Sequence, residues 1–344
     1  MTFSKSILKW FDQHGRKHLP WQHNPTAYRV WVSEIMLQQT QVNTVIPYYE
    51  RFINSFPTVN ILAEATQDEV LAHWAGLGYY ARGRNLHKCA QAIVEHYQGV
   101  FPDTVDALVA LPGIGQSTAG AIISLSSNQR AVILDGNVKR VLARYHGIKG
   151  WPGKTAVANT LWQWAETHTP NTRCADFNQA MMDMGATLCT RSNPRCDRCP
   201  LQKDCYAFHH SQQADFPGKK PKKIQPVKTT QWLVISNPQQ QYYLEQRPPQ
   251  GIWGGLWSFP ELTLDDNVQE YCKTHFGSIK SLEYYTAFRH TFSHYHLDIH
   301  PTLIQLHQPL LHVRDNGCQG WFNQQELAEI GLAAPIKKLL RRLL

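Results

Sequence analysis

The sequence predicts two structural parts, an all-α N-terminal region followed by a smaller α+β region. Up to about residue 210, apolar residues recur with helical spacing in segments separated by glycine and proline. Residues 211–228 (SQQADFPGKKPKKIQPVK) are rich in lysine and proline and suit an exposed linker. Beyond them, short runs of alternating and β-branched residues are typical of strands.

We therefore expect a helical domain over residues 1–210, a linker over 211–228 and an α+β domain over 229–344. The expected helical segments are Tyr28–Val45, Gln67–Trp74, Arg84–Tyr97, Val105–Ala110, Ser117–Ser126, Val138–Tyr145 and Ala156–Thr167. The expected strands are Thr230–Ile235, Gln241–Gln246, Leu282–Phe288, His296–Thr302 and Leu311–Val313, with a helix near Val268–Phe276.

The charge balance favours a polyanionic partner. The chain has 34 Lys+Arg against 26 Asp+Glu, a formal net charge of +8. Many basic proteins bind no nucleic acid, so composition alone leaves the partner open. The N-terminus lacks the apolar core of a signal peptide, and no apolar run is long enough to cross a bilayer. These features predict a cytoplasmic protein without a membrane partner.

Four cysteines lie within one short stretch, with the spacing Cys189-x6-Cys196-x2-Cys199-x5-Cys205. In a cytosolic chain, clustered cysteines favour a metal site over disulfides. Four thiolates so close in sequence can hold a [4Fe–4S] cluster or a zinc ion. Zinc sites more often pair two CxxC motifs around a longer spacer, so the irregular spacing favours the iron–sulfur cluster. Arg191, Arg195, Arg198 and Lys203 lie in the same loop and suit phosphate contacts.

A second motif is Leu111-Pro112-Gly113-Ile114-Gly115, between two expected helices. Gly113 and Gly115 permit a tight turn, and the following helix N-terminus offers backbone N–H groups to a phosphate. Such a turn alone is a weak signal. Asp135, in LDGNV, lies just ahead of the next helix, where an aspartate is usually only an N-cap.

Together, the hairpin, the downstream aspartate and the cysteine spacing resemble the endonuclease III superfamily of DNA glycosylases. Within it, the chain is most similar to the adenine-specific branch, the MutY glycosylases, over essentially its whole length. The resemblance implies a helix–hairpin–helix glycosylase domain, built from a six-helix barrel and a [4Fe–4S] subdomain, that acts as a monomer on double-stranded DNA in the nucleoid.

Two positions indicate the branch. Endonuclease III-type enzymes carry a nucleophilic lysine where this chain has Ser117, and serine cannot form an imine. The resemblance therefore implies a monofunctional enzyme without efficient lyase activity. The segment WVSEIMLQQTQ matches the MutY general-acid motif, with Glu34 as the acid. On one continuous helix, Glu34, Gln38 and Gln41 form a polar stripe, which is usually a solvated face.

The resemblance implies a reaction and a set of site residues. Glu34 protonates adenine N7, Asp135 stabilises the developing oxocarbenium ion, and Asn137 orients the pair. The adenine is flipped out of a duplex in which it faces 8-oxoguanine or guanine. Trp21 and Gln179 match positions that line the adenine pocket. Gln39 and Tyr79 match residues that fill and wedge the base stack, with Leu77 nearby. An ordinary tight turn is the simpler interpretation of GLGYY.

The C-terminal region resembles a Nudix (MutT-like) domain through GIWGGLWSFPE at residues 251–261. Aligning on Gly277 places Tyr271, Thr274 and His275 where the metal-binding glutamates should be, so nucleotide hydrolysis is not expected. Phe292-Ser293-His294 matches the motif by which MutY enzymes sense 8-oxoguanine. A β-strand with alternating surface histidines is the alternative interpretation of this segment.

Three other functions are compatible with parts of the sequence. A thymine- or oxidised-pyrimidine-directed glycosylase would share the chemistry, but Ser117 and the C-terminal domain argue against it. A nucleotide pyrophosphatase would need the glutamates that the Nudix-like helix lacks. A non-catalytic DNA-binding protein with an iron–sulfur cluster would have no need of both Glu34 and Asp135.

Overall fold

A computed structural model of the chain describes residues 2–221, 224–248, 251–292, 294–310 and 318–343. The chain divides into two compact units. The first contains residues 1–64 and 85–222, and the second contains residues 65–84 and 223–344. The helical part was expected to hold all residues up to 210, whereas residues 65–84 pack with the C-terminal region.

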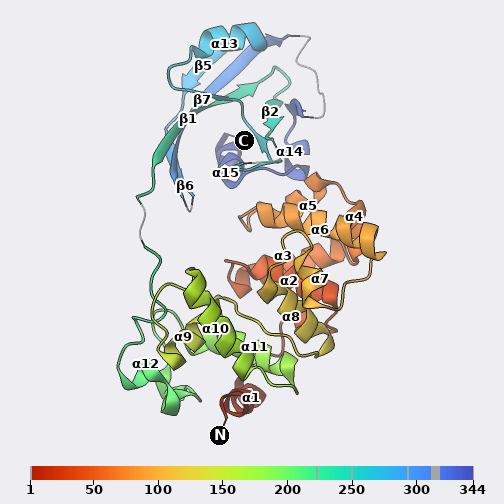
Figure 1. The fold of residues 1–344 in the computed structure, drawn as a ribbon. Coiled ribbons are helices and arrows are strands. Elements are labelled where there is room, and N and C mark those ends of the chain that lie inside the picture. Colours follow the sequence, from red (N-terminus) through yellow and green to blue (C-terminus); the bar gives the residue numbers. More distant parts are fainter. Residues whose placement is uncertain (1, 222–223, 249–250, 293, 311–317, 344) are drawn as a thin grey trace. The chain divides into compact units, whose positions relative to one another are not determined.

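The first unit is helical, as Figure 1 shows in red to green. Its helices are α1 (Phe3–His14), α2 (Ala27–Leu37), α3 (Val42–Ser55), α4 (Val59–Glu64), most of α6 (Ala81–Tyr97), α7 (Val105–Val109), α8 (Gln116–Ser127), α9 (Gly136–His146), α10 (Thr155–His168), α11 (Cys174–Thr187) and α12 (Tyr206–His209). Helix α8 packs against α2, α7 and α11. Helix α1 joins α9, α10 and α11 in an apolar core that includes Ile7, Leu142, Leu161 and Met181. The contact between α8 and α11 therefore connects two groups of helices. One group contains α2, α7 and α8, and the other contains α1, α9, α10 and α11.

The helix expected over Tyr28–Val45 is interrupted, and this part of the prediction was wrong. Helix α2 ends at Leu37, Gln39 has a φ of +59°, and α3 begins at Val42. A left-handed residue cannot continue a right-handed helix. Gln38 and Gln41 therefore do not extend a helical polar stripe from Glu34.

The start of the basic segment 211–228 is fixed to the helical unit. Phe216 is buried in the core beside α9, and the Gly218 N–H donates to the Gly150 carbonyl at 3.0 Å. The buried Arg144 of α9 donates from Nε to the carbonyls of Gln213 at 2.9 Å and Phe216 at 3.0 Å. The freely exposed linker predicted from composition is thus anchored at its beginning.

The second unit is built on a mixed sheet, drawn in cyan to blue in Figure 1. Its strands are β1 (Val227–Ser236), β2 (Tyr242–Gln246), β3 (Trp257–Ser258), β4 (Glu261–Leu262), β5 (Gly277–Tyr284), β6 (Phe288–Thr291), β7 (His296–Pro309) and β8 (Gln319–Phe322). The main strand order is β3-β2-β1-β7-β5, with β1 and β7 parallel. Helix α13 (Val268–His275) packs on the sheet through Val268 and Cys272. The second unit also contains α5 (Gln67–Trp74), α14 (Glu326–Glu329) and α15 (Ala334–Leu343).

Phe292, His294 and Tyr295 lie between the ends of β6 and β7 and belong to neither strand. Thr291 pairs with His296 in the antiparallel register, and the Phe292 N–H donates to the Tyr295 carbonyl at 2.9 Å. The alternative interpretation, a continuous strand of alternating histidines, was therefore wrong at these residues. The strand expected over Leu311–Val313 lies outside the described residues.

Candidate active site and cysteine cluster

Asp135 is held in place at the N-terminus of α9. Its Oδ1 accepts hydrogen bonds from the backbone N–H groups of Asn137 at 3.1 Å and Val138 at 2.8 Å. Its Oδ2 accepts one from the Asn137 side-chain amide at 2.9 Å. The aspartate is therefore an N-cap, as the simpler interpretation proposed. The same bonds orient a partly exposed carboxylate, so the cap does not exclude a catalytic role.

Ser117 supports the segment that precedes Asp135. Its hydroxyl oxygen accepts a hydrogen bond from the Leu134 N–H at 2.9 Å. Ser117 lies in the first turn of α8, so this bond joins α8 to the backbone next to the aspartate. The serine at the position of the endonuclease III lysine thus has a structural contact with the Asp135 turn.

Glu34 lies in the last turns of α2, the helix that packs against α8. Its neighbours Ser33, Ile35 and Met36 are buried, and its own side chain is only partly exposed. Burial, together with repulsion from the Asp135 carboxylate, raises the pKa of Glu34 to about 8. The raised pKa favours a protonated Glu34 carboxyl group at neutral pH.

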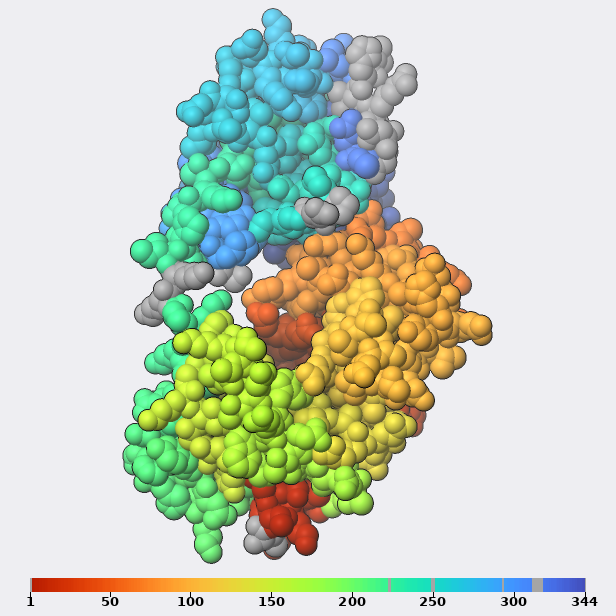
Figure 2. Space-filling view, viewed as in Figure 1, coloured from red at the N-terminus to blue at the C-terminus, as the bar shows by residue number. Residues whose placement is uncertain are grey.

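A pocket of about 250 Å³ opens beside α2, between the N-terminal segment and α11. Trp21 and Gln179, the two residues predicted to line an adenine pocket, both line it, together with Val30 and Ser33 of α2. Glu34 follows Ser33 directly but does not itself line this pocket. In Figure 2 the helical unit is hollowed between its gold and yellow-green parts, with a red segment from the N-terminal region at the base.

A buried carboxylate, Asp183 on α11, supports the pocket wall. Asp183 accepts hydrogen bonds from the Arg16 backbone N–H at 2.7 Å and from Arg16 Nε at 2.8 Å. It also accepts one from the Gln179 side-chain amide at 2.9 Å. Sequence reasoning missed Asp183 and Arg16. The one available signal was the i, i+4 spacing of Gln179 and Asp183, which places both on one face of a helix.

Arg140 connects the Asp135 turn to the cysteine loop. Its Nη2 donates to the Asn137 side-chain oxygen at 2.9 Å and to the Gly185 carbonyl at 2.6 Å. Its Nε donates to the Cys189 carbonyl at 2.7 Å. Asn137 in turn donates to Asp135, so a continuous series of hydrogen bonds joins the carboxylate to the first cysteine. Sequence reasoning did not single out Arg140.

The hairpin before α8 has the geometry that its glycines predicted. Gly113 has a φ of +79°, where a side chain would be strained, and an added Cβ would lie 2.8 Å from the Asn85 Cβ. Gly115 caps the N-terminus of α8, and an added Cβ there would meet no atom within 4 Å. The N-terminus of this 12-residue helix is therefore open to an approaching anion.

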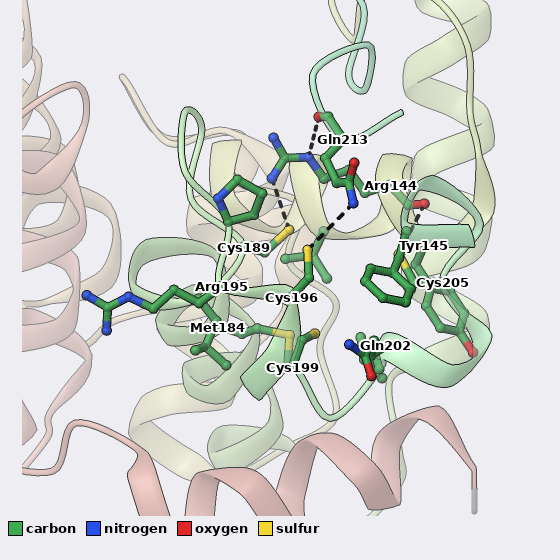
Figure 3. Close-up of a pocket in the computed structure, with 15 residues that line it drawn as sticks. Arg144, Tyr145, Met184, Cys189, Arg195, Cys196, Cys199, Gln202, Cys205 and Gln213 are labelled. Carbon is green, nitrogen blue, oxygen red and sulfur yellow. Dashed lines mark hydrogen bonds between the residues drawn. The ribbon is translucent and has the colours of Figure 1, made fainter. Parts of the chain in front are cut away.

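The four clustered cysteines line one pocket, which Figure 3 shows from close range. The buried Arg144 donates from Nη1 to Cys189 Sγ at 3.3 Å. Gln213 Nε2 lies 3.9 Å from Cys196 Sγ. Burial raises the pKa of Cys199 to about 12, and it also raises the pKa values of Cys196 and Cys205. Keeping these sulfurs as thiolates requires adjacent positive charge, which a bound metal cluster supplies. The residues therefore fit an iron–sulfur cluster.

Exposed cations surround the cysteine loop. The side chains of Arg191, Arg195, Arg198 and Lys203 are all exposed, and in Figure 3 Arg195 points away from the pocket. A rigid loop with its cysteines turned inward and its cations turned outward suits contact with a phosphate backbone.

The residues predicted to contact the base stack lie on two turns. Gln39 is exposed in the turn between α2 and α3. Tyr79 belongs to the second unit, has a φ of +50° and is 49% exposed. The Arg82 guanidinium lies 5.6 Å from its ring centroid. Leu77 is buried in the same turn, with 6% exposure, so this leucine packs inside the protein in the described structure.

The predicted lesion-sensing motif occupies the turn between β6 and β7. Phe292 is half-buried, with its ring centroid 5.0 Å from that of Trp253. His294 is exposed, and Ser293 lies outside the described residues. In this motif the His294 side chain is exposed to solvent, and the neighbouring Phe292 ring packs against Trp253.

Known proteins have sequences similar to this chain over nearly its whole length. The adenine DNA glycosylase of Buchnera aphidicola subsp. Acyrthosiphon pisum (strain APS) is 42% identical over 338 residues, covering 98% of this chain and 96% of the relative. The chain belongs to the adenine DNA glycosylase family. The family member from Homo sapiens is 33% identical, covering 99% of this chain and 73% of the relative.

Models of three known protein families match separate parts of this chain. Residues 32–167 match the HhH-GPD superfamily base excision DNA repair protein, and residues 189–205 match the iron–sulfur binding domain of endonuclease III. Residues 231–342 match the NUDIX domain. The chain is therefore a DNA glycosylase with an iron–sulfur binding loop, and the predicted fold class is confirmed.

Solved structures agree on the fold of the helical region. A thermostable thymine-DNA glycosylase superposes with a TM-score of 0.55 at 28% identity, covering 60% of this chain and 95% of that chain. An endonuclease III–DNA complex superposes with a TM-score of 0.52 at 21% identity, covering 61% of this chain and 95% of that chain. None of the helices in the described residues is long and apolar enough to span a membrane.

Proposed function

We propose that this member of the adenine DNA glycosylase family removes adenine from duplex DNA in which it faces 8-oxoguanine or guanine. The enzyme acts as a monomer, flips the adenine out of the duplex and hydrolyses its N-glycosidic bond. The observation that carries the proposal is the pairing of Glu34, whose pKa is raised to about 8, with the oriented carboxylate of Asp135. A protonated and an ionised carboxyl group are the two groups that N-glycoside hydrolysis requires.

The two carboxyl groups have separate roles. Adenine leaves poorly as an anion, so Glu34 donates its proton to N7 while the bond between the sugar C1′ and N9 breaks. The electron pair of that bond goes to the base, and positive charge develops on the sugar. The Asp135 carboxylate stabilises this oxocarbenium ion, and water adds to C1′. The proton lost by the water returns Glu34 to its acidic form.

The pocket beside α2 supports selection of adenine. The Gln179 amide N–H donates to Asp183, which leaves the Gln179 carbonyl oxygen to accept a hydrogen bond from the exocyclic amine of adenine. Guanine and thymine present a carbonyl oxygen at the corresponding position. Trp21 supplies an apolar wall for the flipped base.

The absence of a lysine at residue 117 supports a monofunctional reaction. The Ser117 hydroxyl contacts the Leu134 N–H and cannot form a Schiff base with the opened sugar. The product is therefore an abasic site whose strand is cleaved only by added alkali.

We further propose that Cys189, Cys196, Cys199 and Cys205 hold a [4Fe–4S] cluster. Four sulfurs around one zinc at about 2.3 Å must all lie close to one another, whereas a cubane places one cysteine on each of four irons. The match of residues 189–205 to the iron–sulfur binding domain of endonuclease III supports iron rather than zinc. The cluster keeps the cationic loop rigid against DNA phosphates.

The remaining predicted contacts complete the proposal. Gly113 and Gly115 bring the N-terminus of α8 to a phosphate. Gln39 and the exposed Tyr79 fill and wedge the stack around the flipped base, and the buried Leu77 lies in the same turn as Tyr79. Phe292, Ser293 and His294 test the base opposite the adenine, because the N7–H and the C8 carbonyl of 8-oxoguanine differ from the groups of guanine.

The proposal is tested by incubating the purified protein with duplexes that contain a central A:8-oxoguanine, A:G, A:T or G:T pair. We expect adenine release from the first two and strand cleavage only after alkali. Release of thymine from G:T would instead favour the pyrimidine-directed alternative. Strand cleavage without alkali would contradict the monofunctional assignment.

A further inference from the structure

Hydrogen bonds connect the region around the Tyr79 loop to the Nudix-like part of the second unit. Arg84, in the first turn of α6, donates from Nη1 to the Gly254 carbonyl at 2.6 Å. The Tyr80 hydroxyl donates to the Leu332 carbonyl at 3.2 Å, and Gln246 Nε2 donates to Asp68 Oδ1 at 3.3 Å. Three bonds from separate residues therefore tie residues 65–84 to strands and loops that lie more than 160 positions later in the sequence.

The Arg84 contact falls on a strained point of the Nudix-like domain. Gly254 follows Trp253, a non-glycine residue with a φ of +53° and only 9% exposure. Such a backbone is maintained only where its surroundings hold it. The Arg247 side chain donates to the Ile252 carbonyl at 3.0 Å, so arginines hold the carbonyls on both sides of Trp253.

Trp253 in turn supports the lesion-sensing turn. Its ring centroid lies 5.0 Å from that of Phe292 and 5.4 Å from that of His290. The Phe292 ring also contacts Tyr295, with the two centroids 4.7 Å apart. A shift of the Trp253 backbone would therefore move the aromatic cluster on which Phe292 and His294 are mounted.

We propose that Arg84 is a specificity-determining positioning residue that links the Gly76–Tyr80 loop to the Phe292–His294 turn through Gly254 and Trp253. The link makes the wedge beside the flipped adenine and the sensor of the opposite purine move as one body. Insertion of Tyr79 into the stack then depends on how well the opposite base fits the sensor. This inference rests on the proposed recognition of 8-oxoguanine.

The test compares adenine release under single-turnover conditions from A:8-oxoguanine and A:G duplexes, with the ratio of the two rates as the readout. We expect Arg84→Ala to lower this ratio by about tenfold, the scale of one hydrogen bond from a charged donor. Arg84→Lys keeps a charged donor and should restore most of the ratio. Lys88→Ala removes an exposed cation one turn later on the same helix and should leave the ratio unchanged.

A double mutant identifies the route of the effect. Phe292→Ala should also lower the ratio, and Arg84→Ala with Phe292→Ala should lower it no further, because both substitutions interrupt one connection. Arg84→Gln, which keeps most of the side chain, replaces Arg84→Ala if that variant does not fold by circular dichroism.

The outcomes separate this inference from the proposed function. A wild-type protein that shows no preference for 8-oxoguanine contradicts the proposed function and the inference with it. A wild-type preference that persists in the Arg84 variants, or effects of Arg84 and Phe292 that multiply, overturns the inference alone.

Discussion

At the scale of single residues, chemistry depends on how the surroundings change a side chain. Glu34 and Asp135 are both carboxylic acids, but one is enclosed by apolar neighbours and the other accepts three hydrogen bonds. Burial favours the neutral form of the first, and donors favour the charged form of any carboxylate. We therefore propose that Glu34 acts as the proton donor and Asp135 as the stabilising anion.

Replacement of Glu34 by glutamine tests the acid role. Glu34→Gln keeps the shape of the protonated side chain but has no acidic proton, so adenine release should fall by at least about a hundredfold while duplex affinity is retained. The wild-type rate should fall as pH rises through about 8, where Glu34 ionises. Single-turnover rates over pH 6 to about 9.5 and a gel-shift assay measure both effects. Substantial activity in Glu34→Gln would show that another group donates the proton.

The raised pKa of Glu34 also makes the stability of the folded protein depend on pH. In the unfolded chain the pKa of this glutamate is near its usual value of 4.5, whereas in the folded chain the pKa is about 8. Between these pH values the folded state binds more protons, so its stability should decline as pH rises. Glu34→Gln should therefore gain melting temperature relative to the wild type at pH 9, and show little difference at pH 4, where both side chains are neutral. Calorimetry at the two pH values measures the difference, and an equal shift at both would contradict it.

At the scale of elements, the active site is assembled where helix ends meet. The first turn of α8 contributes Ser117, the N-terminus of α9 holds Asp135, and the cysteine loop follows α11. Arg140 connects the Asp135 turn to the cysteine loop, because one guanidinium group reaches Asn137, Gly185 and Cys189. We therefore expect the geometry of Asp135, the proposed catalytic aspartate, to depend on the cysteine loop.

Arg140→Ala should slow base release more than it weakens DNA binding. Loss of its hydrogen bonds frees Asn137 and thus the orientation of Asp135, and we expect a loss of about tenfold or more in the single-turnover rate. Lys139→Ala removes the neighbouring cation and is the matched control. Equal losses in the two variants would mean that Arg140 acts only through its charge.

Sequence patterns predicted the elements whose signals are local. The cysteine spacing, the glycines of the hairpin and the aspartate before α9 each occupy a short stretch with a distinctive geometry. The break between α2 and α3 was missed because the left-handed Gln39 carries no glycine or proline signal. Asp183, Arg16 and Arg144 were missed for a different reason. Their main contacts are with residues that are far away in sequence. No pattern of neighbouring residues in the sequence indicates such contacts.

At the scale of the whole molecule, the iron–sulfur loop connects separate parts of the chain, in addition to the DNA contact that we propose for it. Arg144 donates to Cys189 Sγ and to the carbonyls of Thr190 and Arg191, and also to the segment that leads to the second unit. A change at the cysteines is therefore transmitted to both the helical core and the start of that segment.

Cys189→Ser should remove the brown colour of the purified protein, lower its melting temperature and abolish duplex binding. The physical reason is that a missing ligand loosens the loop that holds Arg140, Arg144 and the exposed cations. Iron analysis, visible absorbance and a gel-shift assay measure these effects. Cys318→Ser changes an exposed cysteine of the second unit and should retain the iron. A colourless wild-type protein that contains zinc would contradict the cluster assignment.

The division of the chain at the whole-molecule scale could not be read from composition. Residues 65–84 lie within the stretch that matches the glycosylase family, yet they pack with the Nudix-like region. Their contacts are made by Tyr80, Arg84 and Asp68 to residues near the other end of the chain. Local periodicity predicted helix α5 correctly, but it carried no information about which part of the chain α5 packs against.

The anchoring of Phe216 has a consequence for the tether between the two regions. Only residues 217–226 separate this buried side chain from the start of β1. Even fully stretched, such a segment spans no more than about 35 Å. The covalent path from the helical core to the sheet through this segment is therefore short, which limits how far any insertion-free relative could separate Phe216 from β1.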